Sequence, residues 1–134
     1  MSDAVARENI FPVGISKPTG HWTTVTTARP GKLVFVSGLT AKNERGEIVG
    51  VGDIGAQTRQ VCENLQAAIR AAGGTLADIV RVDVFIKEMT GFKEIHEVRR
   101  QYFGPTPPAS TMVAVSAFTH PDMLIEINAI GVLP

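Results

Sequence analysis

The feature that most restricts this chain is a continuous apolar run, LVFVSG (Leu33 to Gly38), with almost no polar face. Such a run is typical of a strand that is covered on both faces of a sheet. Only two long segments show the period of an amphipathic helix, one from Asp53 to about Ala72 and one from about Gly91 to Phe103. Two helices cannot easily cover both faces of a sheet. The sequence therefore predicts that one sheet face is buried against another chain.

The scarcity of charge supports this prediction. Charged residues make up 19% of the 134 residues, against about 25% in typical domains, although a short chain has a large surface for its volume. The net charge is zero, so neither a nucleic acid nor a membrane surface is expected as a partner. No apolar run approaches the ~18 residues of a membrane helix. The absence of a secretory pattern and the single cysteine, Cys62, predict a cytoplasmic protein.

The remaining segments predict one domain over residues 1–134, with an irregular segment over about 1–14. Apart from Leu33 to Gly38, the expected strands are β-branched or alternating. Helices that return to a sheet in this order predict a two-layer domain, either α+β or mixed α/β. Of the two we expect α+β, with a mixed sheet packed on two helices. The other expected strands are His21–Arg29, a short Glu47–Val49, Ala77–Met89, Ser110–Phe118 and Met123–Leu133.

One glycine-rich motif resembles a dinucleotide-binding motif. Gly50 to Gly55 reads GVGDIG, a literal GxGxxG at a helix start. A dinucleotide site needs this motif directly after the first strand of a βαβ unit, and here only Ile48 and Val49 precede it. We therefore interpret the motif as a flexible loop in which Asp53 caps the helix.

Metal and thiol chemistry have little support. The three histidines, His21, His96 and His120, share no ligand spacing, and neither HExxH nor CxxC occurs. We therefore predict no metal site. Cys62 lies ~80° from the apolar stripe of its helix, which favours an inert, partly buried thiol over a nucleophile.

Two charged residues stand in apolar surroundings. Glu126 lies between Leu124-Ile125 and Ile127, so it belongs either to the polar face of an antiparallel strand or to a pocket as a general base. Arg99 falls within the apolar arc of the second helix, with His96 at the rim. Arg99 either extends along an apolar surface to reach solvent, or spans a contact between subunits, or binds an anion in a cleft.

Taken together, three stretches resemble the Rid family, also called the YjgF or endoribonuclease L-PSP-like family. They are LVFVSGLTA, the segment from AQTRQVCENL to KEMTGF, and the C-terminal PASTMVAVSAFTHPDMLIEINAIGV. The resemblance implies a chorismate-mutase-like fold and a homotrimer with three clefts between subunits. It also implies hydrolysis of reactive enamines or imines, such as 2-aminoacrylate, to ketoacids and ammonia without a cofactor.

The resemblance also suggests site residues. The serine-glycine pair of the family matches Ser37 and Gly38, and its aromatic residue near the first strand matches Trp22. His96 occupies the position of an asparagine in the second helix. Glu126 matches the acidic residue that positions the attacking water.

One position departs from the family pattern. Deaminating members carry arginine in a Pro-Ala-Arg string, where it grips the substrate carboxylate, whereas this chain has Pro108-Ala109-Ser110. Two alternatives follow. Either Arg99 or Lys17 replaces the missing charge, or the ligand is neutral at that end.

Two functions from different classes are compatible with these residues. The first is a Rid-type hydrolase in which Glu126 orients water, Ser110 takes part in catalysis, and Trp22 and Phe92 wall a cleft. The second is a non-catalytic trimer that binds a small metabolite in the same cleft. A ribonuclease is the least favoured function, because the chain has no stripe of basic residues that would bind the phosphates of RNA.

Overall fold

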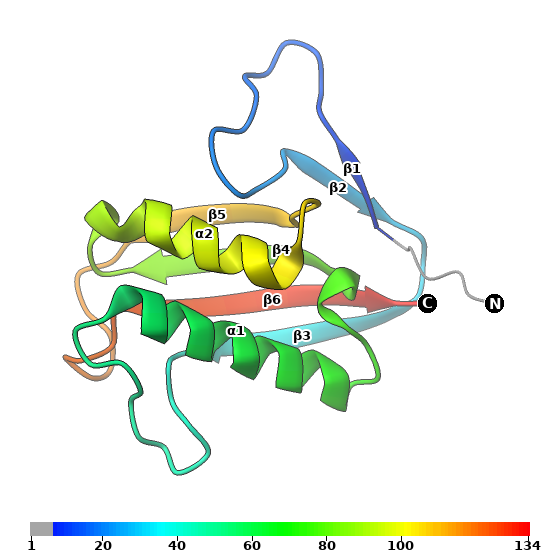
Figure 1. Ribbon diagram of the computed structural model, residues 1–134. Coiled ribbons are helices and arrows are strands. Elements are labelled where there is room, and N and C mark those ends of the chain that lie inside the picture. The colour runs from blue at the N-terminus through cyan, green and yellow to red at the C-terminus, as the bar shows by residue number, and fades with distance from the viewer. Residues whose placement is uncertain (1–6) are drawn as a thin grey trace.

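The chain folds into one main four-stranded sheet with two helices and a separate two-stranded sheet, whose strands β1 and β2 are joined by a long loop (Figure 1). This computed structural model describes residues 7–134. Its 3-10 turns lie at Leu76–Asp78 and Met89–Gly91. The other elements are β1 (Arg7–Ile10), β2 (Val25–Ala28), β3 (Lys32–Leu39), α1 (Ile54–Ala71), β4 (Ile79–Ile86), α2 (Phe92–Phe103), β5 (Ala109–Ala114) and β6 (Ile125–Leu133).

The main sheet is mixed, as predicted. Its strand order is β3-β6-β4-β5, with β4 and β5 parallel and the other neighbours antiparallel. Both helices lie on one face of this sheet, α1 across β6 and β3 and α2 along β5 and β4 (Figure 1). The predicted α+β two-layer arrangement is therefore confirmed. No helix in the described part of the chain is long and apolar enough to cross a membrane.

The ends of α1 follow from local chemistry. The Asp53 side chain accepts a hydrogen bond from the Ala56 N–H at 3.0 Å, which confirms its predicted role as the cap. At the other end Gly73 has a φ of +98° and the Gly74 N–H donates to the Ile69 carbonyl. Glycine is favoured at such a left-handed position, so the Gly73-Gly74 pair ends the helix as expected.

The core lies between the helices and one sheet face. Val82, Val84 and Ile86 of β4 are buried there, which confirms the predicted alternation over most of that strand. Val80 departs from it, because the register with β6 shifts between Ile79 and Arg81 and buries Ile79 instead. Each buried Val or Ile contributes roughly 1.5–3 kcal/mol relative to exposure.

The buried arc of α1 is shifted from the stripe that the sequence predicts. Of the expected residues only two, Val61 and Leu65, are fully buried, whereas Ile54, Ala68 and Ala72 are half-buried. Cys62, expected to be partly buried, is fully buried, and so is Ile69. The reason is that α1 packs against α2 as well as against the sheet. Burial raises the pKa of the Cys62 thiol to about 12, which supports the interpretation of an inert thiol.

The opposite sheet face is open within one chain. Phe35 is 71% exposed and Leu33 is 59% exposed, whereas Val34 and Val36 pack on the core. Val113 of β5 is also exposed on the open side. We call this surface the free face; the side chains that alternate outward onto it are Leu33, Phe35, Arg81, Asp83, Phe85, Thr111, Val113, Glu126, Asn128 and Ile130. The segment Leu33 to Gly38 was expected to be covered on both faces of the sheet. Within the single chain, only the face toward the helices is covered.

The N-terminal segment differs from the prediction. Residues 7–10, expected to be irregular, form β1, while residues 1–6 lie outside the described residues. The Arg7 guanidinium donates to the Ile79 carbonyl at 2.7 Å and to the Thr106 carbonyl, and Asn9 donates to the Pro107 carbonyl. These partners are 70 or more residues away along the chain. A local pattern could not reveal them.

Five of the predicted strands are shorter than expected. Ala77–Met89 is a strand only at Ile79–Ile86, and Met123–Leu133 only at Ile125–Leu133. The segment His21–Arg29 is a strand only at Val25–Ala28, and Ser110–Phe118 only at Ala109–Ala114. Glu47–Val49 is reduced to an isolated bridge between Lys42 and Ile48. Short strands of this kind depend on a partner, which propensity alone does not supply.

Candidate functional site

A pocket lies at the outer edge of the sheet, between α2, β5 and the loop that leads to β2. A bridge between Thr23 and Ala109 ties the loop to β5 and brings Trp22 beside Ser110. The pocket has a volume of about 560 Å³, within the usual range for small ligands. Its walls include four predicted site residues, Trp22, Phe92, His96 and Ser110.

His96 lies at the centre of the aromatic wall. Its ring meets Phe92 edge-on at 5.5 Å between centroids and meets Trp22 at 6.1 Å. The His21 backbone N–H donates to Nδ1 of His96, so the proton of the neutral ring is on Nε2. A Cβ at Gly20 would lie 2.4 Å from Cε1 of His96 and 2.7 Å from Trp22, so glycine is needed for this packing.

The two histidines of this region favour the neutral form. Burial is the main reason that the pKa of His96 falls to about 4, and the nearby Arg99 charge lowers it further. Burial also lowers the pKa of His21. Near neutral pH, His96 is therefore a neutral hydrogen-bonding group and not a cation.

This packing predicts a pH-dependent stability. The pKa of His96 is lower in the folded chain than its ordinary 6.5, so stability is full above that value and falls as the pH drops toward 4. We expect the free energy of unfolding in urea to decrease by about 1–2 kcal/mol between pH 7 and pH 5. His96→Asn should reduce this decrease, whereas His120→Asn on the surface should not. Equal slopes in wild type and His96→Asn would contradict the prediction.

Arg99 lies behind the pocket wall, 1% exposed. The i, i+4, i+7 spacing of Phe92, His96 and Arg99 places all three on one stripe of α2. The Arg99 Nη2 donates to the Ser110 Oγ at 3.1 Å. The prediction of Arg99 within the apolar arc is thus confirmed. Its guanidinium is buried, however, and does not extend along the surface to solvent.

Glu126 and Gly38 meet on the free face. Between Val36 and Leu39 the β3 register shifts by one residue, which places the Ser37-Gly38 pair in a bulge. A Cβ at Gly38 would lie 2.1 Å from Oε2 of Glu126. The carboxylate therefore lies directly against the β3 backbone, in the space that the missing side chain leaves.

This contact supplies a prediction. In Gly38→Ala the new methyl group would displace the end of the Glu126 side chain, which is flexible, so the fold should tolerate it with a change in stability of about 1 kcal/mol. We expect imine hydrolysis, proposed below, to fall by about 10- to 100-fold, because misplacing a reacting group costs rate steeply. Steady-state kinetics and urea unfolding measure the two effects. Gly46→Ala serves as the comparison for the rate alone, because a Cβ at Gly46 would meet no other residue, while its positive φ of +79° makes alanine costly for stability. An equal loss of rate in Gly46→Ala would contradict the prediction.

The predicted site residues fall into two groups. Trp22, Phe92, His96, Ser110 and Arg99 gather at the pocket, whereas Ser37, Gly38 and Glu126 lie at the free face. The register explains the division. Ser110 is paired with the core residue Val82, while Glu126 is paired with Phe85, which points the opposite way.

The pocket also contains residues that we did not predict, namely Thr19, Met89, Thr111 and Met112. One signal could have found Met112, because it has the same strand parity as Ser110. Lys17 lines a different pocket, together with Phe11, Arg100 and Pro107.

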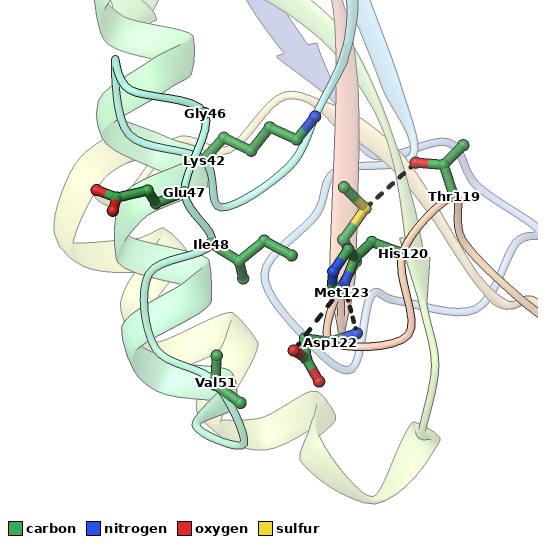
Figure 2. A pocket seen from close by; sticks show the side chains of 9 residues that line it. All are labelled: Lys42, Gly46, Glu47, Ile48, Val51, Thr119, His120, Asp122 and Met123. Atoms are coloured by element: carbon green, nitrogen blue, oxygen red, sulfur yellow. Dashed lines mark hydrogen bonds and ion pairs between the residues drawn. The ribbon is translucent and has the colours of Figure 1, made fainter.

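A further hollow lies at one end of the sheet, between the loop before α1 and the loop before β6 (Figure 2). His120 and Asp122 approach each other there at 3.9 Å, and the Thr119 hydroxyl donates to the Met123 sulfur. Its charged side chains, of both signs, are partly or fully solvent-exposed. It holds none of the predicted site residues, so we do not consider it the candidate site.

The glycine motif forms a loop. Gly50 and Gly52 have positive φ angles, and the residues before them make only the isolated bridge at Ile48. The chain therefore lacks the strand that a dinucleotide site requires directly before this motif. Within residues 7–134, no three His, Cys, Asp or Glu side chains gather closely enough to hold a metal.

Two helices on one face of a mixed sheet, with a pocket of small-ligand size at the outer strand, define an α+β protein of the chorismate-mutase-like type. The chain belongs to the endoribonuclease L-PSP family, the Rid family of the resemblance above. The model of that family matches residues 15–133.

Individual relatives agree with this assignment. A RutC family protein of Pyrococcus horikoshii is 42% identical over 126 residues, covering 93% of this chain and 97% of that protein. The 3-aminoacrylate deaminase RutC of Acinetobacter baylyi is 34% identical, covering 93% and 97% respectively. A crystal structure of a Rid family protein from Yersinia pestis has a TM-score of 0.87 at 32% identity, with coverage of 96% and 99%.

Proposed function

We propose that this protein hydrolyses a small reactive imine or enamine to a carbonyl compound and ammonia, in the cytoplasm and without a cofactor. The observation that carries the proposal is the Glu126 carboxylate, which lies on the free face against the backbone of Gly38. A similar protein is named as a 3-aminoacrylate deaminase. That name supports the same class of reaction here.

The proposal requires a homotrimer. The free face carries exposed apolar side chains that water does not favour, including Phe35 and Leu33. Packing three copies through this face would bury these side chains. It would also let Glu126 of one subunit approach the pocket of the next, so the two groups of site residues would form one cleft.

The chemistry needs modest help from the protein. Glu126 accepts a proton from water as the water oxygen bonds to the carbon of the protonated imine, which gives a neutral carbinolamine. Glu126 then returns that proton to the nitrogen. The C–N bond breaks to release ammonia while the hydroxyl proton passes to Glu126 and the oxygen becomes the carbonyl. Backbone N–H groups near Gly38 and Ser110 stabilise the charge that develops in the cleft. Trp22 and Phe92 hold the substrate and exclude bulk water.

The test is release of ammonia and ketoacid from 2-aminoacrylate generated in place by a second enzyme, with 3-aminoacrylate and 2-aminomuconate as further substrates. We expect the protein to accelerate hydrolysis of at least one of them over the spontaneous rate. Absence of acceleration on all three would refute the proposed activity.

The second candidate function is a non-catalytic protein that binds a metabolite in the same cleft. The observation in its favour is Ser110, a neutral residue at the position where the resemblance implies an arginine in deaminating members. Stable binding of a metabolite in calorimetry, with no turnover of any imine, would favour this function. Turnover without stable binding would exclude it.

A further inference from the structure

Arg99 is a buried cation without an ionic partner among residues 7–134. Its Nε and Nη1 atoms are buried and make no hydrogen bond with the described residues, and only Nη2 has a partner, the Ser110 hydroxyl. No carboxylate of the described chain lies within ion-pair distance of it. An unpaired buried charge is costly, so its retention needs a reason.

The groups around Arg99 do not neutralise it. The Cys62 thiol has a pKa of about 12, raised by burial, and His96 and His21 favour their neutral forms. Burial lowers the pKa of Arg99 itself to about 10, so the guanidinium is charged at neutral pH. The positive charge thus stands directly behind the pocket wall, in a region of low dielectric where its influence is large.

We propose that Arg99 acts through Ser110 to select ligands that carry a carboxylate. Nη2 donates to the Ser110 Oγ, so that oxygen is engaged as an acceptor and its own proton is free to point elsewhere. Ser110 also lines the pocket. Its O–H can therefore donate to a ligand oxygen, which would lie about two hydrogen-bond lengths, ~6 Å, from the buried charge. Arg99 is a positioning residue in this scheme, since it does not line the pocket itself.

The structure favours Arg99 over Lys17 as the replacement for the missing arginine. Lys17 lines a neighbouring pocket, which shares Trp22 with the candidate site, and is exposed. Arg99 is held by the fold at the wall of the pocket that contains Ser110. The alternative of a ligand that is neutral at this end would leave the guanidinium without any counter-charge.

This inference rests on the proposed function, because it places the ligand in the same pocket. Its test, however, measures ligand binding and not catalysis. The probes are pyruvate and its neutral analogue pyruvamide, titrated separately while the amide NMR signals of the intact protein are followed. We expect pyruvate to bind about tenfold more tightly than pyruvamide. Arg99→Met and Ser110→Ala should each abolish the preference, and the double variant should lose no more than either single one. Arg99→Lys should restore part of it.

The control is Arg100→Met, which removes the adjacent, exposed arginine that pairs with Glu97; its preference should remain. A preference that survives in Arg99→Met or Ser110→Ala, or binding of neither probe by wild type, would overturn the inference. If Arg99→Met does not fold, Ser110→Ala decides alone. If the protein hydrolyses imines but binds pyruvate and pyruvamide equally well, only this inference is refuted. If it prefers pyruvate but hydrolyses no imine, only the proposed activity is refuted.

Discussion

Replacing Glu126 by alanine should reduce imine hydrolysis by about 10²- to 10⁴-fold, the usual contribution of a general base. The carboxylate is the acidic group that the fold seats against Gly38, and its removal leaves water without a proton acceptor. Because the effect is on the chemical step, kcat should fall while KM changes little. Glu126→Gln should lose as much, since the amide keeps the shape but cannot accept the proton in the same way.

The matched control is Glu88→Ala, which removes an exposed carboxylate in the turn after β4. It should leave kcat within a factor of two. Urea unfolding of Glu126→Ala should show a change below about 1 kcal/mol, because the side chain is only partly buried. Full activity in Glu126→Ala would remove Glu126 from the proposed mechanism.

Those parts of the fold that depend on local pattern were predictable from the sequence. The Asp53 cap, the Gly73-Gly74 stop and the alternation of β4 each follow from chemistry within a few residues. The strand order could not be predicted from local pattern. The strand β1 could not be predicted either, because its partners lie in segments far along the chain.

The candidate site shows the same limit. Phe92, His96 and Arg99 could be placed on one face of a helix, since their spacing is helical. That Trp22 lies beside them depends on the bridge between Thr23 and Ala109, which no local pattern encodes. The sequence also did not show that the pocket residues and Glu126 lie on opposite faces of the sheet. The division arises from strand parity in a paired sheet, which requires the register to be known.

Replacing Phe35 by aspartate should convert the proposed trimer into monomers and abolish measurable hydrolysis. Phe35 is 71% exposed in the single chain, so the charge should not disturb the fold of one subunit. In a trimer it would be buried without a partner, which is strongly unfavourable. Light scattering should report a mass near 14.3 kDa, in place of about three times that value for the wild type.

The reason for the loss of activity is geometric. Within one chain, Glu126 and the Ser110 pocket face opposite sides of the sheet, so only a neighbouring subunit can bring them together. Val13→Asp is the matched control, because Val13 is a fully exposed apolar residue on the loop after β1. It should keep both mass and activity. A wild-type protein that is monomeric at micromolar concentration would contradict the trimer, and an active Phe35→Asp monomer would show that one chain suffices for the reaction.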